Sequence, residues 1–319
     1  MQDQDAEGRL IHALDLMRNG QNAQAEQALV ELTQDQPRFD LAKFILKELR
    51  AHQVGKATDA QTLKDNPRLS ALVDEARLRW AYRQAPIPTG YVPANLLQLG
   101  DDIPYAIAVD LSRARLFVLQ NRNGLLTIER TYYASSGANG SNKQVEGDEK
   151  TPIGIYNIEK FLSPRQLTPF YGSGALPLNY PNVIDTVSGR TGNGIWIHGV
   201  PRNTYSRPPR SSRGCVVLAN EDLTALRNLV TFQQTPVLVV DSMDWVAPEQ
   251  QAVERQSLSA ALERWRQKWE DLDTDEYLSF YAWDFRTNKL DRNRFVEYKK
   301  LVNAGKTEVK VSLENISLY

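Results

Sequence analysis

Two residues that can do covalent chemistry together, a histidine and a cysteine, lie close in this sequence. His198 and Cys215 are seventeen positions apart, and Cys215 is the only cysteine of the chain. A cysteine nucleophile needs a nearby base to form its thiolate and fixed donors for the oxyanion. Gly199 leaves the imidazole uncrowded, and Gly214 leaves room for a substrate carbonyl beside the thiol. The pattern favours catalysis by Cys215 over the alternative, a small buried apolar residue.

The charges around this pair are one-sided. Between Asp185 and Glu221 there are five arginines and no acidic residue. Positive potential lowers the pKa of a thiol and attracts carboxylates, whereas the alternative is an exposed arginine-rich loop without a role. We expect the polar residues of this segment to bind substrate, namely Ser212, Arg213, Arg210, Arg207 and Arg202.

A metal site is disfavoured. One cysteine with one nearby histidine gives too few ligands for zinc. The other two histidines, His12 and His52, lie in a helical region without glycine or nucleophile neighbours, and we expect both on the surface.

The elements that position the pair are mostly strands. Runs rich in β-branched and aromatic residues, bounded by turn residues, predict strands at 107–110, 115–119, 125–134, 151–158, 192–198 and 236–241. One helix is expected between them, around residues 221–230. The middle of the chain, roughly residues 95–246, is therefore predicted to be mostly β.

Helical patterns lie on both sides of this region. Apolar residues at helical spacing and the breaks at Asn19-Gly20 and Pro37 give residues 8–50 a similarity to a tetratricopeptide unit. After Pro248, helical runs return and end at Gly305. Residues 307–313 then alternate like a strand.

The motifs, taken in order, resemble the L,D-transpeptidase catalytic (YkuD-type) family. His198-Gly199 and, after a loop rich in proline, serine and arginine, Ser212-Arg213-Gly214-Cys215 carry the signature. Upstream, and still in order, the family pattern fits Gly147-Asp148, Lys150 to Gly154, Leu178 to Asn182, Asp185 and Gly194 to His198. The resemblance covers roughly residues 103–241.

This resemblance implies a β-sandwich-like catalytic domain with Cys215 as nucleophile and His198 as base. The carbonyl of Gly199 would orient the imidazole, and the N–H groups of Gly214 and Cys215 would form the oxyanion hole. No metal or organic cofactor is implied. The sequence departs from the family at Arg213, where histidine is frequent, and at Val217, where arginine or asparagine is common. The second departure affects how an acceptor peptide would be held.

A second resemblance covers the C-terminal part. Residues 265–281 are similar to nuclear-transport-factor-2-like (NTF2-like) pocket domains. We therefore expect a multidomain chain with a helical domain at 1–85, a linker at 86–102, the catalytic domain at 103–246 and an incomplete α+β NTF2-like domain at 247–319. The layout resembles cell-shape-determining L,D-carboxypeptidases of helical bacteria, which implies a homodimer through the N-terminal helices.

The composition limits the partners. Lysine and arginine number 38 against 39 acidic residues, so no nucleic-acid surface is indicated, and no apolar run is long enough to span a membrane. The resemblance implies a periplasmic enzyme acting on peptidoglycan stem peptides. Because no export signal precedes the helices and a pocket domain needs several strands, we expect the natural gene product to extend at both ends.

We therefore predict an L,D-transpeptidase that cleaves the L,D bond of tetrapeptide stems, between the diamino acid and the terminal D-Ala. An L,D-carboxypeptidase that trims tetrapeptides to tripeptides is the first alternative. A non-catalytic peptidoglycan-binding scaffold is the second, and the presence of both nucleophile and base argues against it. A cysteine hydrolase of small molecules would fit the pair but not the upstream motifs.

Overall fold

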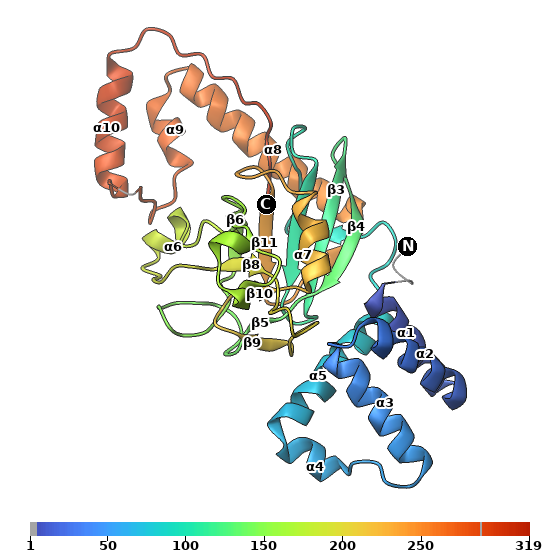
Figure 1. Cartoon of the computed structure of the whole chain (residues 1–319). Coiled ribbons are helices and arrows are strands. Elements are labelled where there is room, and N and C mark those ends of the chain that lie inside the picture. The colour runs from blue at the N-terminus through green and yellow to red at the C-terminus, as the bar shows by residue number, and fades with distance from the viewer. Residues whose placement is uncertain (1–4, 288) are drawn as a thin grey trace.

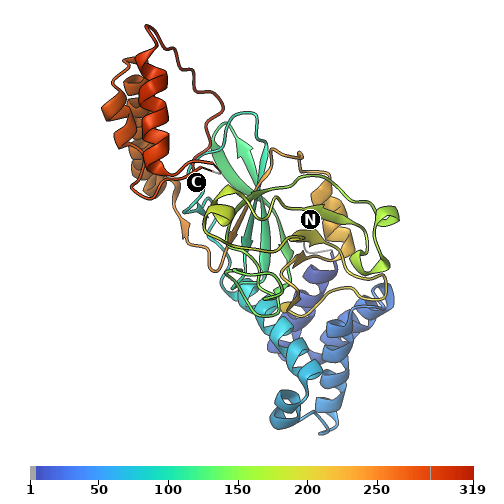
Figure 2. The ribbon, with the colours of Figure 1, turned by 90° about the vertical axis from the view of Figure 1, so that its left-hand side faces the viewer.

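The computed structural model describes residues 5–287 and 289–319. Three parts follow one another along the chain: N-terminal helices, a β-rich middle and C-terminal helices (Figure 1). The two helical parts lie at opposite ends of the β-rich part (Figure 2). None of the helices in the described ranges is long and apolar enough to cross a membrane.

The N-terminal part is a set of helices around one apolar core. They are α1 (Ala6–Arg18), α2 (Asn22–Asp35), α3 (Asp40–Gln53), α4 (Ala60–Asp65) and α5 (Pro67–Gln84). Asp5 caps α1 by accepting from the N–H of Gly8, and Asn66 caps α5, which starts with Pro67. Tyr205, from the β-rich part, packs against this core. His12 and His52 are exposed, as expected.

The largest sheet of the middle part has the strand order β4-β3-β2-β11-β6. β2 and β11 pair in parallel, and the other neighbours are antiparallel. The strands are β2 (Tyr105–Asp110), β3 (Arg115–Arg122), β4 (Leu125–Tyr133), β6 (Gly154–Asn157) and β11 (Pro236–Val240).

A smaller sheet, in the order β10-β8-β7, packs on the larger one. Its strands are β7 (Ala175–Pro177), β8 (Trp196–His198) and β10 (Val216–Val217). Ile107 and Leu116 of the larger sheet share one buried core with Leu176, Ile197 and Val216 of the smaller. This arrangement is the β-sandwich-like fold that the sequence predicted.

Short elements complete the middle part. Two pairs of short strands form at its edges: β1 (Val92–Pro93) with β12 (Trp245–Val246), and β5 (Ser136–Gly137) with β9 (Arg210–Ser212). Besides the expected helix, α7 (Asn220–Arg227), there is a five-residue helix, α6 (Val183–Val187), and two 3₁₀ turns, η2 (Pro164–Gln166) and η3 (Pro169–Tyr171). The sequence analysis missed the last three because each is too short to show periodicity.

The C-terminal part consists of α8 (Pro248–Glu270), α9 (Thr274–Ser279) and α10 (Arg292–Ala304). Asp273 and Asp291 cap the last two, and an aromatic cluster that includes Trp265, Trp269 and Tyr277 joins all three. The prediction of a strand at 307–313 is wrong, because this segment pairs with no strand in the described residues. Only Leu318, further on, forms a bridge, with Gln98.

Candidate active site

The parallel pair of β8 and β10 brings histidine and cysteine together. Val216 lies opposite Ile197, and Val217 lies opposite His198. Ile197 and Val216 point into the core, so their neighbours point to the other face of the sheet because side chains alternate along a strand. Cys215 directly precedes β10 and therefore lies on the same face as His198, diagonally across the strand pair.

His198 is held as a neutral base. Its side chain is buried, and Nδ1 lies 2.6 Å from the carbonyl oxygen of Gly199. This contact places the ring hydrogen on Nδ1 and leaves Nε2 as the acceptor. The pKa of His198 is lowered to about 4: burial is the main cause and the charge of Arg207 adds to it, while the hydrogen bond to the Gly199 carbonyl acts in the opposite direction. At neutral pH the imidazole is therefore ready to take a proton.

Cys215 is held as a thiol. It is half-buried, and its Sγ donates to the carbonyl oxygen of Gly194 at 3.4 Å. Burial raises its pKa above the usual value, while the N–H of Trp196 and the charges of Arg207 and Lys143 act in the opposite direction. The expectation that positive charge would leave a lowered pKa is therefore wrong, because burial outweighs the nearby cations.

The turn before Cys215 is fixed by its own hydrogen bonds. The hydroxyl of Ser212 donates to the carbonyl of Cys215 at 2.6 Å and accepts from the N–H of Gly214 at 3.1 Å. Gly214 has φ +110°, and a Cβ there would lie 2.6 Å from the carbonyl oxygen of Lys150. Ser212, which we expected to bind substrate, is buried, and both hydrogen bonds of its hydroxyl go into the turn.

An aromatic wall that the sequence analysis missed lies against His198. The ring of Tyr171 lies 5.0 Å from those of His198 and Trp196, and the ring of Phe170 lies 5.9 Å from His198. Burial raises the pKa of Tyr171, and the charge of Cys215 adds to the effect. Both rings come from η3, almost thirty positions before His198. No sequence pattern links that turn to the catalytic segment.

Asn220 ties η3 to the histidine strand. Its side chain accepts from the N–H of Ser173 at 2.7 Å and donates to the carbonyl of Val200 at 2.8 Å, and its backbone carbonyl accepts from Ser173 Oγ at 3.0 Å. A Cβ on Gly172 or Gly199 would collide with the Asn220 amide. Glycine is therefore required at both positions by close packing.

The arginines do not form one group. The guanidinium of Arg207 lies 4.7 Å above the ring of Phe170, and its charge acts on both His198 and Cys215. Arg202, Arg210 and Arg213 are exposed around the same loop. Arg190 instead pairs with the buried Asp185 at 2.8 Å, which fixes α6.

Comparisons with known proteins find a family match in each of two parts of the chain. Residues 104–239 match the L,D-transpeptidase catalytic domain (YkuD), and residues 257–319 match the Cds6 C-terminal NTF2-like domain. No curated protein sequence matches the chain.

Two solved structures are similar over most of the chain. Bd1075 from Bdellovibrio bacteriovorus is 33% identical, over 70% of this chain and 80% of that one, with a TM-score of 0.62. The helical cell shape determining protein Pgp2 from Campylobacter jejuni is 30% identical, over 70% and 78%, with a TM-score of 0.60.

Proposed function

Since this chain belongs to the L,D-transpeptidase catalytic family, with a Cds6-type NTF2-like C-terminal domain, we propose that it cleaves the L,D bond of tetrapeptide stems through Cys215. Enzymes of this family modify peptidoglycan, and that general activity holds for this chain. The observation that carries the proposal is that Cys215 and His198 lie on one face of β8 and β10, with the imidazole oriented by Gly199.

The first half of the reaction forms a thioester. Nε2 of His198 takes the thiol proton as Sγ of Cys215 attacks the carbonyl carbon between the diamino acid and the terminal D-Ala. The N–H groups of Cys215 and Gly214 stabilise the oxyanion. The N–H of Gly214 donates to the hydroxyl of Ser212 in this structure, and it must change partner when substrate binds. The imidazolium then protonates the departing amine of D-Ala.

The raised thiol pKa and lowered imidazole pKa support this order of events. With both groups neutral at rest, the thiolate forms only as His198 accepts the proton. The rings of Phe170 and Tyr171 lie against His198 and reduce its contact with water, which strengthens the electrostatic interactions of the transition state. Arg207 supplies the positive charge next to the developing thiolate.

For the second half we propose transfer to the amine of another stem, that is, transpeptidation. The exposed arginines Arg202, Arg210 and Arg213 suit an acceptor that carries carboxylates. Such a subsite raises the effective concentration of the amine above what water can match. Hydrolysis to a tripeptide, as an L,D-carboxypeptidase, is the second candidate. It is favoured by Val217, which is buried and offers no polar group beside the nucleophile.

One experiment separates the two reactions. Purified disaccharide tetrapeptide is incubated with the enzyme, and tripeptide and cross-linked dimer are followed by mass spectrometry at rising acceptor concentration. Dimer that grows with acceptor supports transpeptidation. Tripeptide without dimer at every concentration would establish the carboxypeptidase instead. Neither product, with the thiol still reactive, would leave the scaffold function as the better account.

The setting of this activity is also part of the proposal. We place the enzyme in the periplasm, where peptidoglycan lies, and propose a role in cell shape because the similar Pgp2 is a cell shape determining protein. We propose a helical domain at 1–85, a linker at 86–102, the catalytic domain at 103–246 and the NTF2-like domain at 247–319. A homodimer through the N-terminal helices is testable by light scattering of the full chain against one lacking residues 1–85.

A further inference from the structure

The loop between the two catalytic residues is held by the N-terminal helical part. The ring of Tyr205 lies 4.3 Å from that of Phe39, at the start of α3. The next residue, Ser206, donates its hydroxyl to Glu75 of α5 at 2.7 Å. Two consecutive loop residues are therefore anchored on helices that precede them by more than a hundred positions.

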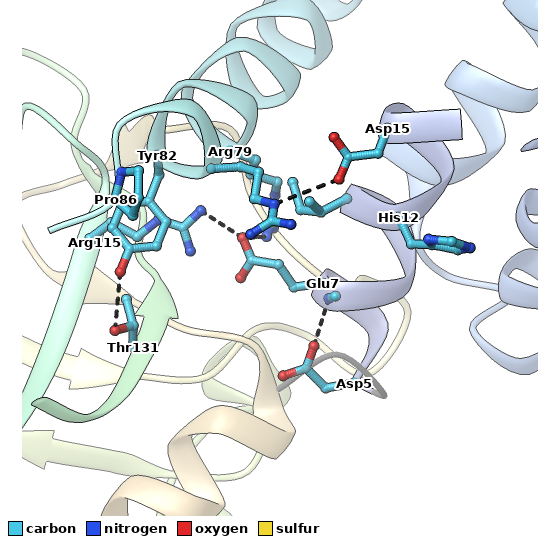
Figure 3. A pocket seen from close by; sticks show the side chains of 12 residues that line it. Asp5, Glu7, His12, Asp15, Arg79, Tyr82, Pro86, Arg115 and Thr131 are labelled. Carbon is cyan, nitrogen blue, oxygen red and sulfur yellow. Dashed lines mark hydrogen bonds and ion pairs between the residues drawn. The ribbon is translucent and has the colours of Figure 1, made fainter. Parts of the chain in front are cut away.

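Glu75 is itself fixed by a buried ion cluster. Arg79 pairs with Glu75 at 2.9 Å and with Glu7 at 3.0 Å, and Arg115 of β3 pairs with Glu7 at 2.7 Å. Figure 3 shows Glu7 between the two guanidinium groups, beside a cavity of about 570 Å³. Glu75 and Arg79 are each 2% exposed. Since removing one partner would leave a buried charge uncompensated, this cluster makes a rigid base for Ser206.

The same cluster reaches Arg207, the next loop residue. The hydroxyl of Tyr133 donates to the carbonyl of Arg207 at 2.9 Å, and the guanidinium of Arg79 lies 3.7 Å above the Tyr133 ring. The backbone at 206–207 is thus held on both sides. The Arg207 side chain continues from there over Phe170, which contacts His198.

We propose that Glu75 is a positioning residue of the active site: through Ser206 it fixes Arg207, whose guanidinium lies over Phe170 next to His198. The N-terminal helical part is then a structural component of catalysis. This inference rests on the proposed function for its consequence in turnover. The placement of Arg207 over Phe170 does not depend on which substrate is used.

The test is a double-mutant cycle on the reactivity of Cys215. Iodoacetamide alkylation is followed by intact mass across pH for the wild type, Ser206→Ala, Arg207→Met and the double variant. Arg207→Met slows alkylation at pH 7.5, because a charge that favours the thiolate is lost. Ser206→Ala slows it by about twofold to tenfold, the range that one hydrogen bond corresponds to. The double variant is no slower than Arg207→Met alone, because Ser206 acts only through Arg207.

Two further variants complete the design. Thr58→Ala removes another hydroxyl that donates to a glutamate, Glu48 at 2.8 Å, in the same helical part but away from the loop. Its alkylation profile stays that of the wild type. Glu75→Gln slows the alkylation of Cys215 to the same extent as Ser206→Ala. It replaces Ser206→Ala in the experiment if Ser206→Ala does not fold.

Two outcomes would overturn the inference: an unchanged profile for Ser206→Ala and Glu75→Gln, or additive losses in the double variant. The proposed function fails separately, if tetrapeptide is not turned over while the cycle behaves as described. Where turnover is measured, kcat for Ser206→Ala falls with the alkylation rate, and the thermal unfolding midpoint matches that of Thr58→Ala.

Discussion

Val217 lies directly opposite His198 in the parallel pair of β8 and β10, and the next residue, Leu218, donates its N–H to the carbonyl of His198 at 2.9 Å. This register fixes how His198 and Cys215 lie relative to each other. A shift of one residue would turn Cys215 into the core. The backbone pairing of two very short strands therefore sets the geometry of the catalytic pair.

We expect that replacing either residue of the proposed catalytic pair removes turnover but not the fold. Cys215→Ala substitutes a half-buried thiol by a smaller apolar group, and His198→Gln keeps most of the volume at the end of β8. We expect turnover of disaccharide tetrapeptide to fall by about a thousandfold or more in each. Near-native activity in either variant, with unchanged circular dichroism, would remove that residue from the mechanism.

The pH dependence of the pair follows from its two pKa shifts. The thiol pKa is raised, so alkylation of Cys215 accelerates as pH rises above 9 and is slow at pH 7. The imidazole pKa is lowered to about 4, so His198 remains a neutral base, and kcat/KM does not fall on the acid side until the pH approaches 4. The rate of alkylation by iodoacetamide as a function of pH measures the pKa of the thiol, and the pH–rate profile of kcat/KM measures the pKa of the imidazole. An alkylation rate already maximal at pH 6 would indicate a thiolate–imidazolium pair instead.

A carbapenem acylates Cys215. Its strained ring presents a carbonyl where that of the stem peptide would lie, and ring opening releases no atom. We expect the intact mass to rise by the full mass of the drug, with the adduct on the peptide that contains Cys215. Cys215→Ala serves as the control. An unchanged mass, although iodoacetamide still labels the thiol, would argue against the proposed acyl transfer.

Asp222 opposes stability at high pH. It is half-buried, and burial raises its pKa to about 7, with Glu7 and Asp5 adding to the effect. The folded state therefore favours the protonated acid: this contribution to stability is full below about pH 4 and is lost as pH rises to 7. Asp222→Asn should raise the free energy of unfolding at pH 8 by about 1–3 kcal/mol.

The control for that prediction is the neighbouring residue. Glu221→Gln removes the same charge from an exposed position, and its stability stays within about 0.5 kcal/mol of the wild type. Urea unfolding at pH 4, 6 and 8 measures both variants. An Asp222→Asn effect that is equal at pH 4 and pH 8 would contradict the titration argument.

Asn220 links stability to catalysis. Asn220→Ala leaves the N–H of Ser173 and the carbonyl of Val200 without their partner, so we expect a loss of about 1–3 kcal/mol in unfolding free energy. Because Ser173 follows η3, the wall of Phe170 and Tyr171 loosens and kcat falls. Asn228→Ala, just after α7, is the matched control. A destabilised Asn220→Ala with unaltered kcat would show that the wall does not depend on this link.

Much of the fold was readable from local patterns. Short runs of β-branched and aromatic residues between turn residues predicted β2, β3, β4 and β11, because buried strands show as continuous apolar segments in their own sequence. The aspartates before α9 and α10 are local signals as well, since a cap acts within one turn. The tail at 307–313 shows the limit of this reasoning: alternation fits a strand, but a strand also needs a partner.

The sequence by itself also determined the identity of the candidate pair. Cys215 is the only cysteine, it follows a glycine, and the motifs around it and His198 occur in a recognisable order. What only the tertiary structure decided is the state of that pair. Counting arginines suggested a lowered thiol pKa, yet burial of Cys215 raises that pKa, because desolvation outweighs the nearby charges. Likewise, Ser206 meets Glu75 across 131 positions. Burial and such distant contacts depend on how separate elements pack, and no local pattern records that packing.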